Sequence, residues 1–433
     1  MCYAIPGRIV SISGKTATLE YFGEKRKANI IGFENKKLEP GNYVYAQGGI
    51  IVDVISENEA LPILEAWRER FIELRKIDEN LKARGTEKWE SELASIIEKT
   101  QNGRLLKFNE MKKILETNDS EELESLFESA NRIRSKNIQN ACCVHGIIEF
   151  SNYCVNECAY CGINKGNAKL KRYRMSADEI VDRSEFCVKS LGFKALVLQS
   201  GEDPFYTDQM LIDIVKRIRS RCGVLLFVSI GERTFECYKA LYDAGAYGAL
   251  VRFETSNARL YAKMRHGKKL EDRITLIKNL KAHGFILATG FIIGLPGALI
   301  QDQINDILLT KSLKPDMFSF GPLIPHPCTP LKDVKKVSID YALKIISLSR
   351  LVALESHILV TTALETLDPD GKRRGLLAGA NSLMINVTPE KYKEDYEIYP
   401  SKTRDSKLKT NEVIQETLSL LYSLGRAPTD LGK

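Results

Sequence analysis

From His145 onward, short apolar runs alternate with segments that have the length and periodicity of helices. The eight runs span residues 146–150, 195–199, 224–229, 248–253, 286–293, 317–321, 358–362 and 383–385. Apolar strands that alternate with helices are typical of βα units, which pair into a parallel sheet. Eight strands fit a closed (β/α)8 barrel of the TIM type better than an open, doubly wound sheet. The expected fold class is therefore α/β, with the functional site among the residues that follow each strand.

A small β module and a helical connector are expected before this barrel. Short β-like stretches lie at residues 8–12, 16–21, 28–31 and 43–46. Ser56 can cap a helix with apolar residues at three- and four-residue spacing, and charged amphipathic helices follow. The chain thus divides into a β module with its helix (1–80), a helical connector (81–140), the barrel (141–400) and a helical extension (401–433).

Composition excludes several classes of protein. Apolar residues make up 44% of the chain and charged residues 27%, so a disordered chain is excluded. No run approaches the ~18 apolar residues of a membrane span, and the first residues lack the features of a secretory signal, so a cytoplasmic location is expected. The net charge of +7 is small and evenly spread, and the basic run 165–174 adjoins a cysteine loop. We therefore expect neither a nucleic-acid nor a membrane partner.

Three cysteines, Cys154, Cys158 and Cys161, stand on one loop directly after the first barrel strand. A structural zinc site needs a fourth ligand nearby, but the next cysteine, Cys187, lies inside a helical segment. Three thiolates leave one iron of a cubane cluster without a protein ligand, and such an iron can bind a small bidentate molecule. The spacing therefore favours a [4Fe–4S] cluster with one open coordination site.

This C-x3-C-x2-C spacing, with Tyr160 before the last cysteine, resembles the radical S-adenosylmethionine (SAM) superfamily. The resemblance implies that the open iron binds the amino and carboxylate groups of SAM. It also implies that the reduced cluster cleaves SAM to methionine and a 5′-deoxyadenosyl radical, so the three cysteines count as catalytic residues. An electron donor of the reduced ferredoxin or flavodoxin type is implied as a partner.

Residues at the ends of later strands extend this resemblance. Gly201 fits the family's glycine-rich turn, because a residue without Cβ lets the backbone approach a ligand closely. Arg252 and Glu254 share one face of the fourth strand, and a buried charge pair there favours a role in ligand binding. Arg273 is a candidate for the SAM carboxylate. The residues expected to bind SAM are Tyr160, Gln199, Ser200, Gly201, Glu202, Glu254 and Arg273.

Blocks of sequence between about residues 105 and 400 resemble one clade of this superfamily, which holds the [FeFe]-hydrogenase maturase HydE, the mutase PylB and biotin synthase. The blocks are 148–154, 172–175, 198–203, 252–255, 294–297, 321–327, 361–364 and 396–400. The resemblance implies action on a small iron–cysteine or sulfur-containing precursor of a hydrogenase cofactor, alongside other maturation proteins. It implies a substrate cavity lined by Arg252, Thr361, Thr362 and Tyr399.

Two positions depart from the pattern of this clade. Cys328 stands where its members usually carry an acidic residue, which favours either a harmless change on a loop or altered substrate chemistry. Residues 401–433 contain no cysteine, so a second cluster is not expected there.

The first ten residues resemble the start of the HypC/HupF chaperones of [NiFe]-hydrogenase maturation, over about residues 1–75. That resemblance implies that Cys2 is an iron ligand. Two alternatives stay open: radical or sulfur chemistry on an amino-acid metabolite, as in PylB and biotin synthase, and a non-catalytic iron scaffold. A SAM-binding set is superfluous for a scaffold, and Cys2 is superfluous for a metabolite mutase.

Overall fold

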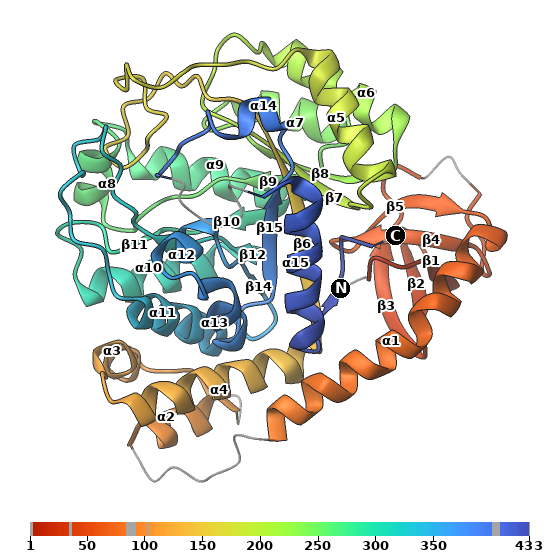
Figure 1. Ribbon diagram of the computed structural model, residues 1–433, viewed down its shortest axis with the longest axis horizontal. Coiled ribbons are helices and arrows are strands. Elements are labelled where there is room, and N and C mark those ends of the chain that lie inside the picture. The colour runs from red at the N-terminus through yellow and green to blue at the C-terminus, as the bar shows by residue number, and fades with distance from the viewer. Residues whose placement is uncertain (1–2, 34–36, 84–91, 102–103, 401–407, 433) are drawn as a thin grey trace.

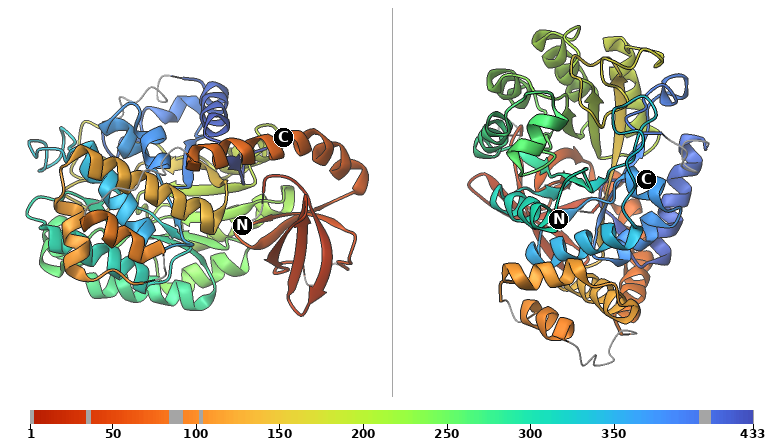
Figure 2. Two further views of the ribbon diagram at one scale, coloured as in Figure 1. Left: turned by 90° about the horizontal axis from the view of Figure 1, so that it is seen from below. Right: turned by 90° about the vertical axis from the view of Figure 1, so that its left-hand side faces the viewer.

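Two β-barrels of different size, joined by helices, make up this computed structural model (Figure 1). The structure describes residues 3–33, 37–83, 92–101, 104–400 and 408–432. The larger barrel has helices around its outside, and the smaller barrel lies at one of its ends (Figures 1 and 2).

The larger barrel is a parallel eight-stranded sheet. Its strands are β6 (Ala141–Ser151), β7 (Ala195–Ser200), β8 (Leu225–Ser229), β9 (Gly248–Leu250), β10 (Ile286–Thr289), β12 (Met317–Phe318), β14 (His357–Ile358) and β15 (Ser382–Asn386). The edge strands β14 and β15 meet where the N–H of Val360 donates to Ser382 O (2.9 Å) and the N–H of Asn381 donates to Ile358 O (3.1 Å). The predicted α/β fold of the (β/α)8 type is confirmed.

Several strands end earlier than the apolar runs that predicted them. The run 248–253 gives a strand of only three residues, β9, because the chain leaves the sheet before Glu254, whose backbone is left-handed with φ 65°. The runs 286–293 and 317–321 each divide, and β11 (Ile292–Ile293) pairs with β13 (Gly321–Pro322) beyond the main sheet. These early endings leave room for irregular backbone at the mouth of the barrel.

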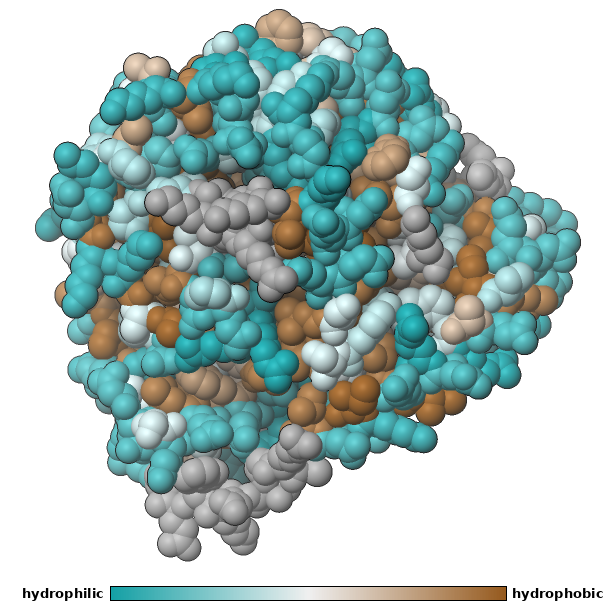
Figure 3. Space-filling view, viewed as in Figure 1, coloured by the Kyte–Doolittle hydropathy of each residue, from teal (hydrophilic) through white to brown (hydrophobic). Residues whose placement is uncertain are grey.

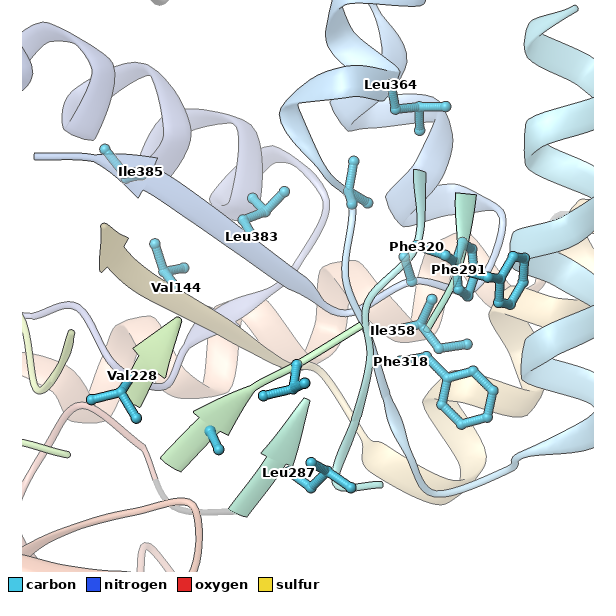
Figure 4. Close-up of a cluster of buried hydrophobic side chains, with 14 of the residues drawn as sticks. Val144, Val228, Leu287, Phe291, Phe318, Phe320, Ile358, Leu364, Leu383 and Ile385 are labelled. Carbon is cyan, nitrogen blue, oxygen red and sulfur yellow. The ribbon is translucent and has the colours of Figure 1, made fainter. Parts of the chain in front are cut away.

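Helices cover the outside of the sheet. In chain order they include α5 (Ala177–Lys189), α6 (Asp208–Arg221), α7 (Phe235–Asp243), α8 (Ala258–Met264), α9 (Leu270–His283), α10 (Ile300–Ser312), α11 (Ile339–Val352), α12 (Thr362–Leu367) and α13 (Gly371–Leu377). Outward-facing strand residues such as Val144, Val228 and Leu383 form the apolar layer beneath them (Figure 4). On β6 the alternate residues Cys143 and Glu149 face the interior, so this strand carries polar side chains into the barrel.

The smaller barrel is closed by five strands in the order β1-β2-β3-β5-β4. They are β1 (Gly7–Ser13), β2 (Thr16–Tyr21), β3 (Glu24–Asn29), β4 (Tyr43–Gln47) and β5 (Ile50–Ile55). Compared with the sequence prediction, β3 begins earlier than residue 28 and β5 is additional. Ser56 caps α1 (Glu57–Ala83) as predicted, because its Oγ accepts from the Glu59 N–H (3.3 Å) and Glu59 accepts from the Ser56 N–H (3.0 Å).

The small barrel closes the end of the large barrel where the parallel strands begin. Ile50 and Val52 pack against Leu225 and Phe227, at the start of β8. Between β4 and β5, Gly48 lies so near Ile286 that a Cβ at position 48 would stand 2.6 Å from its Cδ1. The carboxyl ends of the strands stay free of this packing, so ligands can approach the large barrel from that side.

Three helices of the connector pack along the large barrel near α11 (Figure 1). They are α2 (Glu92–Gln101), α3 (Phe108–Glu116) and α4 (Ser120–Ile138). After the loop helix α14 (Glu390–Lys393), the chain ends with α15 (Thr410–Ser423) and β16 (Ala427–Pro428), which pairs with the start of β6. Within the described residues, no helix is long and apolar enough to span a membrane, and the face in Figure 3 mixes hydrophilic and hydrophobic residues.

Candidate functional site

A loop that follows β6, residues 152–167, carries the three cysteines and is held by one arginine. Nη1 of Arg172 donates to the carbonyl oxygens of Asn152 (2.5 Å) and Ile163 (2.8 Å), and Nη2 donates to Asn164 O (2.5 Å). These carbonyls lie on both sides of the cysteines, so one planar guanidinium fixes both ends of the loop. Nothing in the spacing of the sequence marks Arg172 for this task.

Two glycines let neighbouring segments touch this loop. A Cβ on Gly201 would stand 2.2 Å from Tyr153 O and 2.8 Å from the Cβ of Cys154, so only glycine fits this turn. The N–H of Val155 donates to Glu202 O (3.0 Å), which joins the turn to the loop. A Cβ on Gly162 would stand 2.1 Å from the carbonyl oxygen of Glu397. The cysteine loop is thus packed on both sides by backbone.

The cysteines themselves suit a cluster better than a single ion. Cys158 is buried and Cys154 and Cys161 are half-buried. Burial raises the pKa of the Cys158 thiol, and Arg265 and a hydrogen bond from Tyr160 oppose that shift. Among the described residues, no group of three metal-ligand atoms within 4.8 Å of one another includes these sulfurs. Three thiols on one fixed loop, which do not form such a close group, fit separate irons of a [4Fe–4S] cluster.

A network of charged side chains lies beside the loop. Nε of Arg273 donates to Oε1 of Glu232 (2.8 Å), and Arg265 Nη2 lies 3.5 Å from Oε1 of Glu202. Arg273 is only 3% exposed, and its buried Nη2 forms no hydrogen bond within the described part of the chain. Its Nη2 lies 4.0 Å from Oε1 of Glu202, beyond hydrogen-bond distance, so this nitrogen can still donate to the carboxylate of a small ligand.

Two members of this network, Arg265 and Glu232, were not predicted from the sequence. Burial alone would lower the pKa of Arg265, but the charges of Tyr160, Cys158, Tyr261 and Glu232 raise it, so the guanidinium stays cationic beside the cysteine loop. Glu232 follows β8 by three residues, at the carboxyl end of a barrel strand, and that position was the available signal.

Arg252 and Glu254 form an ion pair at 2.8 Å, but they do not share a strand face as the sequence predicted, because β9 ends at Leu250 and both residues follow it. Glu254 has φ 65°, a backbone conformation that is strained for a residue with a side chain and typical of functional sites. Its carbonyl accepts from the Ile292 N–H (2.9 Å), and Oδ1 of Asp306 accepts from the Ser256 N–H (2.5 Å). The loop after β9 is therefore anchored on both sides of Glu254.

Polar residues that follow β9, β14 and α14 converge at the barrel mouth. The hydroxyls of Thr362 and Tyr399 are hydrogen-bonded to each other. Oγ1 of Thr361 is buried and has no hydrogen-bond partner among the described residues. Positive charge on Arg252 lowers the pKa of Tyr399, although burial raises it more strongly. Three predicted substrate residues, Arg252, Thr362 and Tyr399, thus lie in one neighbourhood.

Glu149 on β6 carries a carboxyl group into the barrel interior. It lies within the sequence block 148–154 but was not predicted as a site residue. It accepts from Asn386 Nδ2 (2.7 Å) and lies 3.5 Å from Nε2 of Gln199. Burial raises its pKa to about 8, against the opposing effects of Asn386 and Lys393. A glutamate within an otherwise apolar strand run was the signal that could have revealed it.

Three other residues singled out from the sequence, Ser200, Gln199 and Cys328, make short local or cross-strand hydrogen bonds. The hydroxyl of Ser200 donates to Gly201 O (2.7 Å), within the turn that contacts the cysteine loop. Gln199 accepts from Ser229 Oγ through Oε1 (3.3 Å). The N–H of Cys328 donates to Nδ1 of His326 (3.1 Å) on a turn. Cys2 lies outside the described residues.

Comparisons with known proteins identify relatives of both barrels. Residues 148–307 match the Radical SAM superfamily, and residues 1–67 match the HupF/HypC family. The [FeFe] hydrogenase maturase subunit HydE of Thermotoga maritima is 40% identical over 73% of this chain and 90% of its own length. The 3-methylornithine synthase of Methanosarcina acetivorans is 30% identical over 67% of this chain and 82% of its own length.

Solved structures support the same fold. The crystal structure of methylornithine synthase (PylB) superposes with a TM-score of 0.68 at 26% identity, covering 77% of this chain and 97% of that one. The hydrogenase maturase HydG from Carboxydothermus hydrogenoformans superposes with a TM-score of 0.67 at 21% identity, over 83% of this chain and 84% of that one. The likeness to HydG concerns the fold alone.

Proposed function

Since the chain belongs to the radical SAM superfamily and, within it, to the family of the [FeFe] hydrogenase maturase subunit HydE, we propose that it matures a hydrogenase metal cofactor by radical chemistry. Its substrate is a small iron–cysteine or sulfur-containing precursor. The observation that carries the proposal is the cysteine loop held by Arg172 beside buried Arg273, whose Nη2 forms no hydrogen bond among the described residues.

The cluster and SAM are the cofactors of this enzyme superfamily. Cys154, Cys158 and Cys161 hold three irons of the [4Fe–4S] cluster. When bound, the reduced cluster supplies the electron that splits SAM into methionine and a 5′-deoxyadenosyl radical. Arg172 keeps the loop in one conformation, so the cysteines reach the cluster without a large ordering cost.

The residues around the loop receive SAM. Arg273 donates from Nη2, which forms no hydrogen bond within the described residues, to the methionine carboxylate, while Glu232 accepts from its Nε. The turn at Gly201, with Gln199, Ser200 and Glu202, offers acceptors for the ammonium group because no side chain blocks the backbone at position 201. Tyr160 and Glu254, both beside the cysteines, complete the SAM-binding set.

The substrate lies deeper in the barrel, against Arg252, Thr361, Thr362 and Tyr399. A guanidinium and three hydroxyl groups suit a small anionic molecule with several acceptor atoms. The buried, unpartnered Oγ1 of Thr361 offers a hydrogen bond that no described protein atom uses. Enclosure within the barrel keeps water from the reactive radical.

The proposed division of the chain follows its two barrels: the module with its helix (1–80), the connector (81–140), the large barrel (141–400) and the extension (401–433).

The enzyme takes electrons from a ferredoxin- or flavodoxin-type donor in the cytoplasm and works with other hydrogenase maturation proteins. Cys2 of the HypC-like module holds an iron species for the barrel. If Cys2→Ala leaves iron loading and hydrogenase maturation unchanged, this role of Cys2 is wrong.

A second candidate function is a rearrangement of an amino-acid metabolite. It is favoured by the 3-methylornithine synthase at 30% identity, which shares 82% of its length with this chain. A non-catalytic iron scaffold has less support, because it would not need buried Arg273, whose Nη2 forms no hydrogen bond among the described residues, beside the cysteine loop.

The deciding experiment is anaerobic cluster reconstitution followed by reduction in the presence of SAM. We expect release of 5′-deoxyadenosine or an adenosylated product, and loss of both in Cys158→Ala but not in Cys222→Ala. A reduced cluster that never consumes SAM would contradict the enzyme. Addition of an iron–cysteine precursor or of an amino-acid substrate, in parallel, separates the two catalytic candidates by which one yields product.

A further inference from the structure

A second group of metal-ligand side chains lies at the opposite end of the large barrel. Sγ of Cys143, an imidazole nitrogen of His145 and a carboxylate oxygen of Asp430 all lie within 4.8 Å of one another. No other set of three such residues meets this distance in the described part of the chain. From this grouping we propose that Cys143, His145 and Asp430 form a second site, for one divalent transition-metal ion such as Zn²⁺ or Fe²⁺.

Different parts of the chain bring these donors together. Cys143 and His145 are two residues apart on β6, so both face the barrel interior. Asp430 follows β16, and its Oδ2 accepts from the Val144 N–H (3.2 Å) and from Thr429 Oγ1 (2.7 Å). Backbone and hydroxyl donors therefore fix the carboxylate before any ion binds, as in preorganised metal sites.

Burial and charge both favour an ion here. His145 is 3% exposed and Asp430 is 2% exposed, and the contacts that offset burial of this carboxylate are the His145 imidazole at 3.4 Å and its hydrogen bonds, to which an ion would add. A thiolate and a carboxylate together carry two negative charges, which one divalent cation neutralises. Sulfur, nitrogen and oxygen donors in one site suit Zn²⁺ and Fe²⁺ rather than Ca²⁺ or Mg²⁺, which prefer oxygen alone.

Hydrogen bonds within the protein satisfy only one of the two ring nitrogens of His145. Nε2 of His145 lies 3.4 Å from Asp430 Oδ2, but Nδ1 is buried and has no hydrogen-bond partner within the described residues. Coordination through Nδ1 would give this nitrogen a partner that the described protein atoms do not supply. Nδ1 of His357 lies 3.1 Å from Sγ of Cys143 and 3.1 Å from Nδ2 of Asn381, so this ring borders the site without belonging to the group of three.

This site is separate from the cysteine loop. With a rise of about 3.3 Å per residue, His145 and the end of β6 at Ser151 are about 20 Å apart. The site instead lies where the small barrel meets the large one. A Cβ on Gly432, two residues beyond Asp430, would stand 3.1 Å from the Cβ of Ala4 in the small barrel. A metal ion bound to Asp430 would thus secure the chain end on which the small barrel rests.

Zinc retention by the cluster-loaded, full-length protein tests the proposal. After equilibration with Zn²⁺ and removal of free metal, we expect about one zinc per chain, with X-ray absorption showing one sulfur ligand at about 2.3 Å. Cys143→Ser should lower the retained zinc at least tenfold and remove the sulfur ligand, while iron per chain stays constant. Cys222→Ala, a half-buried cysteine on another surface, should change neither value.

Two isosteric variants guard against misfolding. Asp430→Asn and His145→Gln should each lower zinc retention at least tenfold while the far-ultraviolet circular dichroism is unchanged. If Cys143→Ser fails to fold, these two variants decide the outcome. Zinc that is not retained by the wild-type protein, or that is retained equally by all the folded variants, would overturn the proposal. Either result leaves SAM cleavage, and so the proposed function, unaffected.

Discussion

Gly201 lies directly against the carbonyl oxygen of Tyr153, at a distance that excludes any side chain at position 201. This contact joins the end of β7 to the start of the cysteine loop. The N–H of Gly201 also donates to Ser151 O (3.0 Å), so the turn and the loop share their backbone hydrogen bonds. A shift of one necessarily moves the other.

The first prediction concerns this contact. Gly201→Ala should displace the cysteine loop, because a Cβ would stand 2.2 Å from Tyr153 O, and backbone atoms cannot yield cheaply. We expect at least a tenfold loss of 5′-deoxyadenosine formation, with fewer irons per reconstituted chain. Gly14→Ala is the control, because no atom lies within 4 Å of a Cβ there and the cost is confined to its left-handed backbone. Equal activity in the two variants would contradict the role of this contact.

A second prediction concerns Arg172. Arg172→Lys keeps the positive charge but loses the planar fork that reaches Asn152, Ile163 and Asn164 together. We expect iron per chain after reconstitution to fall to half or less, and the loop to be cleaved faster by protease in the absence of iron. Lys165→Arg, at an exposed position on the same loop, should leave both measurements at the wild-type level.

A third prediction follows from Glu149, whose pKa burial raises to about 8. The folded protein then holds a proton that the unfolded chain has already released, so this residue stabilises the fold less and less as the pH rises from about 4.5 to about 8. Between pH 6 and 7.5 the loss is about 2 kcal/mol, from about 1.4 kcal/mol per pH unit. Glutamine does not titrate, so over this pH range the unfolding free energy of Glu149→Gln should rise by that amount relative to that of the wild type.

Denaturant unfolding of both proteins at several pH values provides the measurement for Glu149. The difference in unfolding free energy between Glu149→Gln and the wild type should change in favour of the glutamine variant as the pH rises. A difference that stays constant with pH would show that Glu149 has an ordinary pKa in the folded protein.

Sequence patterns revealed the elements that bury apolar side chains and missed those that do not. β7 and the part of β6 from residue 146 onward were predictable because their residues are almost entirely buried, whereas the start of β6 at Ala141 was missed. β3 was misplaced because Glu24, Lys25, Arg26 and Lys27 hide its pairing with β2, and only Ala28 is fully buried. β5 was missed although its apolar, β-branched residues follow two glycines, a pattern that is typical of a strand after a turn.

The residues of the candidate site likewise fall into some that the sequence predicts and some that it does not. Cys154, Cys158 and Cys161 were predictable because their spacing along one loop carries the chemistry. Arg172 and Arg265 were not, because their roles arise from side-chain contacts that depend on how the chain folds back, with Asn164 for Arg172 and with Glu202 for Arg265. No spacing rule anticipates where an arginine side chain meets a distant carbonyl.

The last prediction tests Arg273 as the residue that binds the SAM carboxylate. Arg273→Lys should retain a charge near Glu232, whose Oε1 is 2.8 Å from Nε of Arg273, but lose the second donor, Nη2. Because one charge-assisted hydrogen bond is worth about 1.5–3 kcal/mol, we expect the KM for SAM to rise about tenfold or more. Lys278→Ala, an exposed residue on the same helix, should leave KM unchanged. Iron per chain should be the same in all three proteins, because Arg273 is not a cluster ligand. A lowered kcat with an unchanged KM would place Arg273 outside the SAM site and assign the carboxylate to another cation, for which Arg265, whose charge acts on Cys158, is the candidate.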